Sequence, residues 1–222
     1  MKKSLIIIFV LLAQITFAQV TKNLGDFDKV KVYDKLNVKL IPASENKIII
    51  VGNRENEVEV VNKNGELKIR MPFPKLLSGE DISIKLYFIN IESISASRGS
   101  YVSGDKTIKQ TSIDLNAKEG SEINLDLDVK NINSKANSGG IIDLSGNATN
   151  QNSNITSGAF LKAKDLHTSI TNVNVAAGGK AEIYATSLVN AKVKAGGSVY
   201  IYGKPKQINK EIFIGGTITE RN

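Results

Sequence analysis

Residues 173–201 read VNVAAGGKAEIYATSLVNAKVKAGGSVYI and contain two copies of one short motif. In each copy an alternating apolar and polar run leads into a pair of glycines, and a second alternating run follows them. The marker, a glycine followed by a small residue, recurs as Gly99-Ser100, Gly120-Ser121, Gly139-Gly140, Gly158-Ala159, Gly178-Gly179, Gly196-Gly197 and Gly215-Gly216. The first glycines are 21, 19, 19, 20, 18 and 19 residues apart. A nearly fixed period of this length is typical of a solenoid.

Alignment of the copies on the first glycine reveals columns that are almost wholly apolar. The column three residues before the glycine is Ala96, Ala117, Ala136, Ile155, Val175, Val193 and Ile212. The column three residues after it is Val102, Ile123, Ile142, Leu161, Ala181, Val199 and Ile218. The column five residues after it is apolar or glycine until Glu220, and the intervening positions are mostly polar. Alternation with a period of two predicts strands with one buried face.

The glycine pair predicts a corner in each copy. The residue before it is charged in Arg98 and Glu119, and an unpaired charge in an apolar interior costs several kcal/mol. Strict alternation would point this residue inward, so we expect the chain to bend at the pair, where glycine permits positive φ angles. Each copy is then a strand, a corner, a second strand and a return.

These features predict an all-β fold, a right-handed parallel β-helix with coils of about 19 residues and a β-rich N-terminal section. A coil of this length has a perimeter of roughly 60 Å, and neighbouring coils pair about 4.8 Å apart. The right-handed sense follows from the general preference of parallel crossovers. The alternative is a β-sandwich or barrel with coincidental glycine spacing, which the agreement of the columns over seven copies disfavours.

Residues 1–18 have the features of a secretory signal peptide. Lys2 and Lys3 precede an apolar run from Leu5 to Leu12, and Thr16-Phe17-Ala18 forms a cleavage site before Gln19. The alternative, a membrane anchor, needs a longer apolar run. We therefore expect export to the periplasm, the cell surface or the medium. The chain has no Cys, which excludes disulfides and a lipidated N-terminal cysteine.

The mature chain divides into a leader, residues 19–25, and one β-helical domain, residues 26–222. Residues 26–90 are β-rich without the repeat, and residues 91–222 carry the repeat coils. Asn64-Gly65 lies between two alternating runs, which is a strong hairpin signal. We expect the non-repeat section to cap or open the solenoid, because a terminal coil otherwise exposes apolar surface and unpaired strand groups.

The formal net charge of +7 is dispersed along the chain. Because neither a basic stripe nor a recognised motif is present, no nucleic-acid partner is expected. We also expect no transmembrane segment in the mature chain. The expected partner is an unidentified surface glycan or envelope protein, and homo-oligomers are compatible with the sequence.

Several segments together resemble the head GIN domain family of proposed auto-transporter adhesins. They are residues 27–32 (FDKVKV), 65–70 (GELKIR), 95–100 (SASRGS), 194–199 (KAGGSV) and 202–205 (YGKP). The resemblance covers roughly residues 24–220. It implies an exported β-helical protein with an adhesive role and brings no catalytic residues. The family's usual Ser-Gly-Gly-Ser corner is changed here at Arg98-Gly99-Ser100 and at Gly158-Ala159.

The candidate binding residues are three tyrosines in outward columns. Tyr184 and Tyr202 lie six residues after the glycine in adjacent copies, and Tyr200 lies four after it. Aromatic side chains offer large, stiff contact area for a partner. The alternative is an aromatic ladder that shields strand pairs.

Catalytic and metal sites find little support. His167 is the only histidine. No Gly-x-Ser-x-Gly nucleophile elbow of a hydrolase accompanies it, and a histidine metal cluster would need a second imidazole. We therefore expect no cofactor, no metal and no enzymatic activity, and we predict a non-enzymatic envelope protein that binds a surface. Asp105, Asp126 and Asp143 leave open a carbohydrate-active β-helix enzyme of the lyase or hydrolase type. A third possibility is a structural assembly module that stacks through the solenoid ends.

Overall fold

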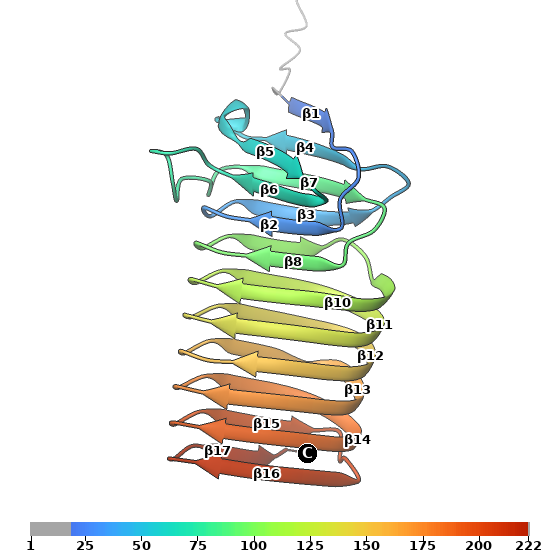
Figure 1. Cartoon of the computed structure of the whole chain (residues 1–222), viewed down its shortest axis with the longest axis vertical. Helices are drawn as coiled ribbons and strands as arrows, with labels where there is room; N and C mark the ends of the chain where they lie inside the picture. The colour runs from blue at the N-terminus through green and yellow to red at the C-terminus, as the bar shows by residue number, and fades with distance from the viewer. Residues whose placement is uncertain (1–18, 222) are drawn as a thin grey trace, which may run out of the picture.

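The computed structural model describes residues 19–221, which form a single column of stacked coils (Figure 1). The segment predicted to be the signal peptide lies outside the described residues. The described part contains one short 3-10 helix, η1 (Glu55–Glu57), and 17 strands that share one sheet. The strands are β1 (Gln19–Asn23), β2 (Lys29–Val32), β3 (Asn37–Pro42), β4 (Lys47–Val51), β5 (Glu59–Lys63), β6 (Glu66–Arg70), β7 (Ser83–Phe88), β8 (Ser93–Ala96), β9 (Tyr101–Gly104), β10 (Ile108–Lys118), β11 (Glu122–Asn137), β12 (Ile141–Ile155), β13 (Phe160–Ala176), β14 (Lys180–Lys194), β15 (Ser198–Tyr202), β16 (Gln207–Phe213) and β17 (Thr217–Glu220).

The predicted parallel β-helix is confirmed. Strands β10 to β14 pair in parallel with their neighbours, and Ile123 lies beside Ile142, which lies beside Leu161. The front strands in Figure 1 run leftward and the rear strands rightward as the chain descends, so the solenoid is right-handed. Each long strand, β11 to β14, runs from one glycine corner to the next and includes the bend between them. The glycine pairs interrupt the strand pairing at the opposite edge of the solenoid.

The apolar columns fill the interior as the alternation predicts. Val102, Ile123, Ile142, Leu161, Ala181 and Val199 are all fully buried. The last coil differs, because Ile212 is 50% exposed and no further coil covers it among the described residues. Glu220 in this coil forms an ion pair with Lys210 at 2.6 Å. The register partners of these two residues in the coil before are apolar, Ile201 and Ala191.

Each corner places at least two consecutive residues at positive φ. At Ala177 and Gly178 the φ angles are 48° and 74°, and the Gly179 N–H donates to the Ala176 carbonyl at 3.1 Å. Two positive φ angles between a carbonyl and an N–H three residues later are typical of a type I′ turn. The residue after the first glycine of each corner lies against the backbone of the preceding coil, and this close approach explains why it is always small. A Cβ added to Gly140 would lie 2.2 Å from the Ala117 carbonyl oxygen.

The N-terminal section is interleaved with the solenoid. Strand β2 pairs in parallel with both β6 and β8, and β3 pairs in parallel with both β7 and β9. The coil formed by β2 and β3 therefore lies between two coils that follow it in sequence. Antiparallel strands β1, β4 and β5 lie above these coils, and β1 places most of the expected leader against β4. The β5–β6 hairpin turns at Asn64-Gly65, as the sequence predicts.

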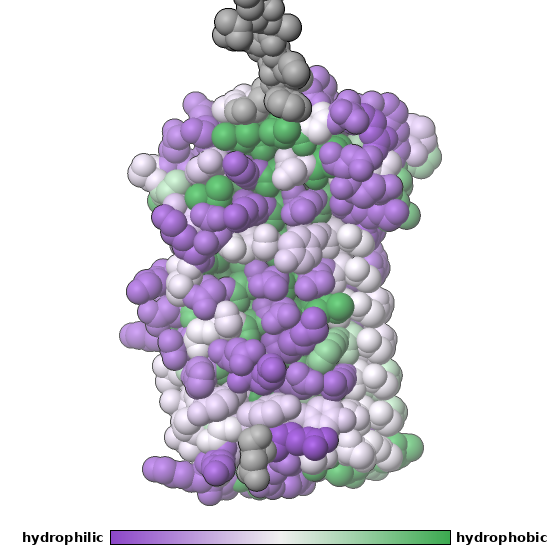
Figure 2. All heavy atoms as spheres, turned by 180° about the vertical axis from the view of Figure 1, so that it is seen from behind, coloured by the Kyte–Doolittle hydropathy of each residue, from purple (hydrophilic) through white to green (hydrophobic). Residues whose placement is uncertain are grey.

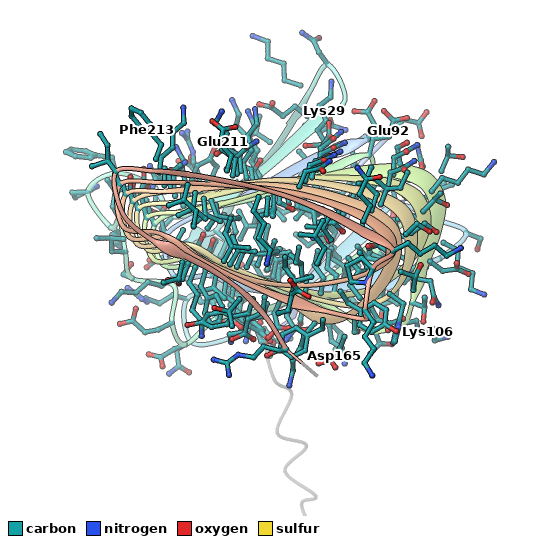
Figure 3. The ribbon with its side chains drawn as sticks, turned by 90° about the horizontal axis from the view of Figure 1, so that it is seen from below. Lys29, Glu92, Lys106, Asp165, Glu211 and Phe213 are labelled. Atoms are coloured by element: carbon teal, nitrogen blue, oxygen red, sulfur yellow. The ribbon has the colours of Figure 1, made fainter. Side chains whose placement is uncertain are left out.

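The cross-section is flattened, with two broad outer faces (Figure 3). One face carries β2, β8, β16 and the second halves of β11 to β14, and Lys29 and Glu211 project from it. The other face carries β9, β15, β17 and the first halves of β11 to β14. We call the first the amide face and the second the tyrosine face.

Candidate binding surfaces

A continuous ladder of side-chain amides runs along the amide face. It consists of the outward residues six positions before each corner glycine. They are Asp114, Asn133, Asn152, Asn172, Asn190 and Asn209. Each asparagine Nδ2 donates to the Oδ1 of the preceding coil, at 2.9, 3.3, 2.8, 2.7 and 2.7 Å in chain order. The regular coil length keeps these positions in register, so the short side chains can meet. We call this row the amide ladder.

A second outward column runs beside the ladder and completes a groove. This column, four positions before the glycine, is Ser95, Asn116, Lys135, Asn154, Asn174, Lys192 and Glu211. Between the two columns lie two adjoining hollows of about 550 Å³ and 500 Å³. Because both hollows are lined by Asn172 and Asn174, they form one groove along the solenoid axis. We call it the amide groove.

The ladder leaves hydrogen-bonding capacity unused. A primary amide has two N–H donors and a carbonyl oxygen with two lone pairs. Each inner rung, from Asn133 to Asn190, uses one donor and one lone pair to bond its two ladder neighbours. One donor and one acceptor site therefore remain at each rung. Asn133 and Asn152 are exposed and Asn172 and Asn190 are partly exposed, so these groups face solvent or a ligand.

The amide ladder was not among the residues predicted from sequence. The signal was present, because the glycine alignment places Asn at the same outward position in five consecutive copies, from Asn133 to Asn209. Polar residues at outward positions are also what a solvated strand requires. The side-chain hydrogen bonds and the groove distinguish this column from a row of merely solvated side chains.

The tyrosine face brings the predicted tyrosines together. Tyr184 and Tyr202 are register partners in β14 and β15. The Tyr184 ring also packs edge-on against His167, with ring centroids 4.3 Å apart. A Cβ added to Gly203 would lie 2.8 Å from the Tyr184 ring, so this ring lies directly against the Gly203 backbone. These contacts tie Tyr184 to the coils on either side of it.

Tyr200 has a different environment. Two cations lie over its ring, with Lys180 Nζ 5.1 Å and the Arg221 guanidinium carbon 5.2 Å from the ring centroid. A shallow hollow of about 360 Å³ is lined by these three residues with Glu182 and Tyr202. The hydrogen bond to Glu182 raises the pKa of Lys180, so the ammonium keeps its charge beside the ring. Figure 2 shows this face, where polar residues cover much of the middle and pale corner residues follow the right-hand edge.

The acidic residues considered for catalysis are separately paired. Asp105 binds Lys39 at 2.5 Å, and this hydrogen bond lowers the pKa of the carboxyl group. Asp126 accepts a hydrogen bond from Ser145, and Asp143 lies 3.5 Å from Lys162. Within residues 19–221 no group of three or more His, Asp or Glu side chains is placed to hold a metal ion. The same residues include no helix of sufficient length and apolar character to cross a membrane.

The fold and its faces define a parallel β-solenoid with long, regular polar surfaces. The chain belongs to the family described as "putative auto-transporter adhesin, head GIN domain", whose sequence profile matches residues 26–205. This match confirms the resemblance noted from sequence. A search of curated proteins finds no match.

Solved structures share the fold at low sequence identity. A putative adhesin from Bacteroides fragilis is 17% identical, with a TM-score of 0.85 over 92% of this chain and 97% of that one. A putative adhesin from Parabacteroides distasonis is 18% identical, with a TM-score of 0.77 over 92% and 97%. A putative lipid-binding protein from the same species is 16% identical, with a TM-score of 0.71 over 92% and 96%. At these sequence identities the structural likeness establishes the fold alone.

Proposed function

We propose that this chain is an exported, non-enzymatic protein of the cell envelope that binds a surface polymer through the amide groove. The observation that carries the proposal is the amide ladder, which presents the same unsatisfied groups at one coil after another. The described adhesive role of the family supports a binding function. The signal peptide expected at residues 1–18 supports export.

The chemistry of the groove favours binding over hydrolysis. Most glycoside hydrolases place two carboxyl groups across the scissile bond. Among the described residues that line the groove, carboxylates occur only toward its ends, at Asp114 and Glu211. The stretch between them is lined mainly by amides with three lysines, Lys135, Lys192 and Lys210. These groups can hold a ligand but lack an acid–base pair.

The tyrosine face is proposed as a second contact surface in the same function. Tyr200 and Tyr202 line its shallow hollow beside Lys180 and Arg221. Aromatic rings beside fixed cations can contact a sugar or a protein partner. Tyr184 is assigned a supporting role, because its ring is packed against His167 and Gly203.

The last coil favours assembly as a second candidate function. Ile212, Phe213 and Ile214 are 50%, 58% and 75% exposed at the glycine-corner edge of this coil. Strands β16 and β17 pair on only one side in the described structure. Analytical ultracentrifugation of the wild type and of Phe213→Lys tests this function: a concentration-dependent dimer that the substitution abolishes supports it, and a monomer in both cases contradicts it.

Binding of the mature chain to whole cells tests the main proposal. The double variant Asn152→Leu with Asn172→Leu breaks the centre of the ladder, and Asn124→Leu with Asn147→Leu, at exposed asparagines outside the groove, is the control. We expect at least a tenfold loss of cell binding for the groove variant and wild-type binding for the control. Equal binding by wild type and groove variant contradicts the proposal. Intact mass of protein from the envelope fraction tests export, with a chain beginning at Gln19 as the expected result.

A further inference from the structure

We infer that the amide groove takes a linear, uncharged polysaccharide that lies along the solenoid axis with about one sugar unit per coil. This inference rests on the proposed function, because it names the polymer that the groove would bind. It follows from the spacing, the hydrogen-bonding groups and the charge of the groove.

The spacing of the ladder suits an extended sugar chain. Neighbouring coils in a β-helix lie about 4.8 Å apart, so the five steps from Asp114 to Asn209 span about 24 Å. One pyranose in an extended β-linked chain advances by a similar length. A polysaccharide along the axis therefore keeps its register with successive rungs, and a groove of this length accommodates about five or six units.

The free groups of the ladder match hydroxyl groups. Each inner rung leaves one N–H donor and one acceptor site, and a sugar hydroxyl both donates and accepts a hydrogen bond. All five ladder bonds run in the same direction, from Nδ2 of one coil to Oδ1 of the coil before it. The rungs are consequently equivalent, and a polymer of identical units can repeat one contact along the groove.

The charges in the groove favour an uncharged polymer. Along the five copies from Asn133 to Asn209 the ladder positions are all amides, and the lysines that line the groove are Lys135, Lys192 and Lys210. An anionic polymer is typically bound by Lys or Arg side chains that neutralise several of its charges, as phosphate backbones are. Lys192 is paired with Glu211 at 2.5 Å, and Lys210 with Glu220 at 2.6 Å, so these ion pairs neutralise that end of the groove.

A peptide strand fits this surface less well than a glycan. Extended peptides join sheets at exposed edges through main-chain hydrogen bonds. The groove lies on a sheet face, where the backbone groups of β11 to β14 already pair with neighbouring coils. Side-chain amides are the available partners there, and their spacing follows the solenoid axis rather than a strand.

This mode of binding predicts a characteristic dependence on ligand length. None of the described residues that line the groove is aromatic, so affinity must accumulate from many weak hydrogen bonds. A net contribution typical of one hydrogen bond strengthens association by about two- to tenfold per sugar. Affinity should therefore rise steadily up to five or six units and then level off.

Isothermal titration of the mature chain with β-1,4-linked glucose and N-acetylglucosamine oligomers of two to six units tests the inference. We expect the affinity of one series to increase at each added unit. The variants Asn152→Leu with Asn172→Leu, and Asn154→Lys with Asn174→Lys, should weaken hexamer binding at least tenfold. The second pair blocks the groove while keeping every ladder residue. The control Asn124→Leu with Asn147→Leu changes exposed asparagines outside the groove and should bind as the wild type does.

Three outcomes would overturn the inference. One is tighter binding of a polygalacturonate oligomer or a polar peptide of matched length, and another is affinity that does not change with length. The third is absence of binding to either neutral series while cell binding still depends on the groove. In that last case the proposed function stands with a different polymer. If the groove variants also bind cells as the wild type does, both proposals fail.

Discussion

Arg98 of the first glycine corner forms an ion pair with the buried carboxylate of Asp34, 64 residues earlier in the chain. Arg98 Nη2 donates to Asp34 Oδ2 at 3.2 Å, and Nε lies 2.7 Å from Oδ1 without the geometry of a hydrogen bond. Asp34 Oδ2 also accepts the Met71 N–H at 3.1 Å, and the guanidinium lies over the Tyr33 ring. One side chain thus joins the corner of the β2–β3 coil to the first repeat corner below it and to the residue after β6.

Loss of the arginine should destabilise the N-terminal section strongly. Arg98→Met leaves Asp34 fully buried with an uncompensated charge, and breaking a buried pair in this way costs about 3–5 kcal/mol. The matched control is Asp128→Asn, which removes an exposed pair with Lys109 at 3.6 Å and should cost less than about 1 kcal/mol. Urea unfolding of both variants measures the difference. Similar losses would show that the Asp34–Arg98 pair contributes no more than a surface pair.

The two glycines of one corner should respond differently to alanine. Gly139 has open space around its Cβ position but a φ of +73°, so Gly139→Ala should cost about 1–2 kcal/mol from the backbone conformation alone. In Gly140→Ala the new Cβ would meet the Ala117 carbonyl 2.2 Å away, which requires the backbone of two coils to move. We expect Gly140→Ala to cost more than about 3 kcal/mol. Thermal unfolding of the two variants decides the order, and a larger loss for Gly139→Ala would contradict the corner geometry.

The alternation of buried and exposed positions gives a direct test of the coil register. Val175 is buried and pairs with Val193, whereas Asn174 is exposed beside it. Val175→Asp should cost several kcal/mol, because it places a charge in the interior. Asn174→Asp introduces the same side chain one residue away and should change stability by about half a kcal/mol. Comparable shifts in the unfolding midpoint would refute this register.

The repeat could be predicted from sequence because each coil repeats the same local requirements. Val193 and Val199 fall in apolar columns on either side of a glycine pair, and both are buried. Such a pattern depends only on neighbouring residues and on the coil length. The small residue after each first glycine was also visible, although its cause, the carbonyl of the preceding coil, required the structure.

The interleaved N-terminal coil could not be predicted in the same way. Its corner is Asp34-Lys35, where both residues have positive φ (64° and 60°) although neither is glycine. Lysine rarely adopts this conformation. The Lys35 N–H donates to the carbonyl of Arg98, which lies far along the chain in the first repeat corner. The position of β2 between β6 and β8 likewise depends on pairing between segments far apart in sequence. The amide groove was missed because the aligned asparagines look like ordinary solvent-facing residues until stacking of the coils brings their side chains within hydrogen-bonding distance.

The tyrosines offer a final test that separates support from recognition. Tyr184→Ser removes a ring that packs against His167 and the Gly203 backbone, so we expect a loss of about 1–3 kcal/mol and a lower melting temperature. Tyr200→Ser removes a ring whose main contacts are the cations of Lys180 and Arg221, and exposed cation–π contacts contribute about 0.5–1 kcal/mol each.

Differential scanning calorimetry measures both stabilities, and binding to whole cells measures the contribution to recognition. If Tyr200 and Tyr202 form a second contact surface, the double variant Tyr200→Ser with Tyr202→Ser should lose several-fold in cell binding, while Tyr184→Ser should bind nearly as the wild type does below its melting temperature. The proposal for this face fails if the double variant binds cells normally. The assignment of Tyr184 as a supporting residue fails if its replacement leaves the melting temperature unchanged, because a ring packed between coils cannot be removed without loss of contact area.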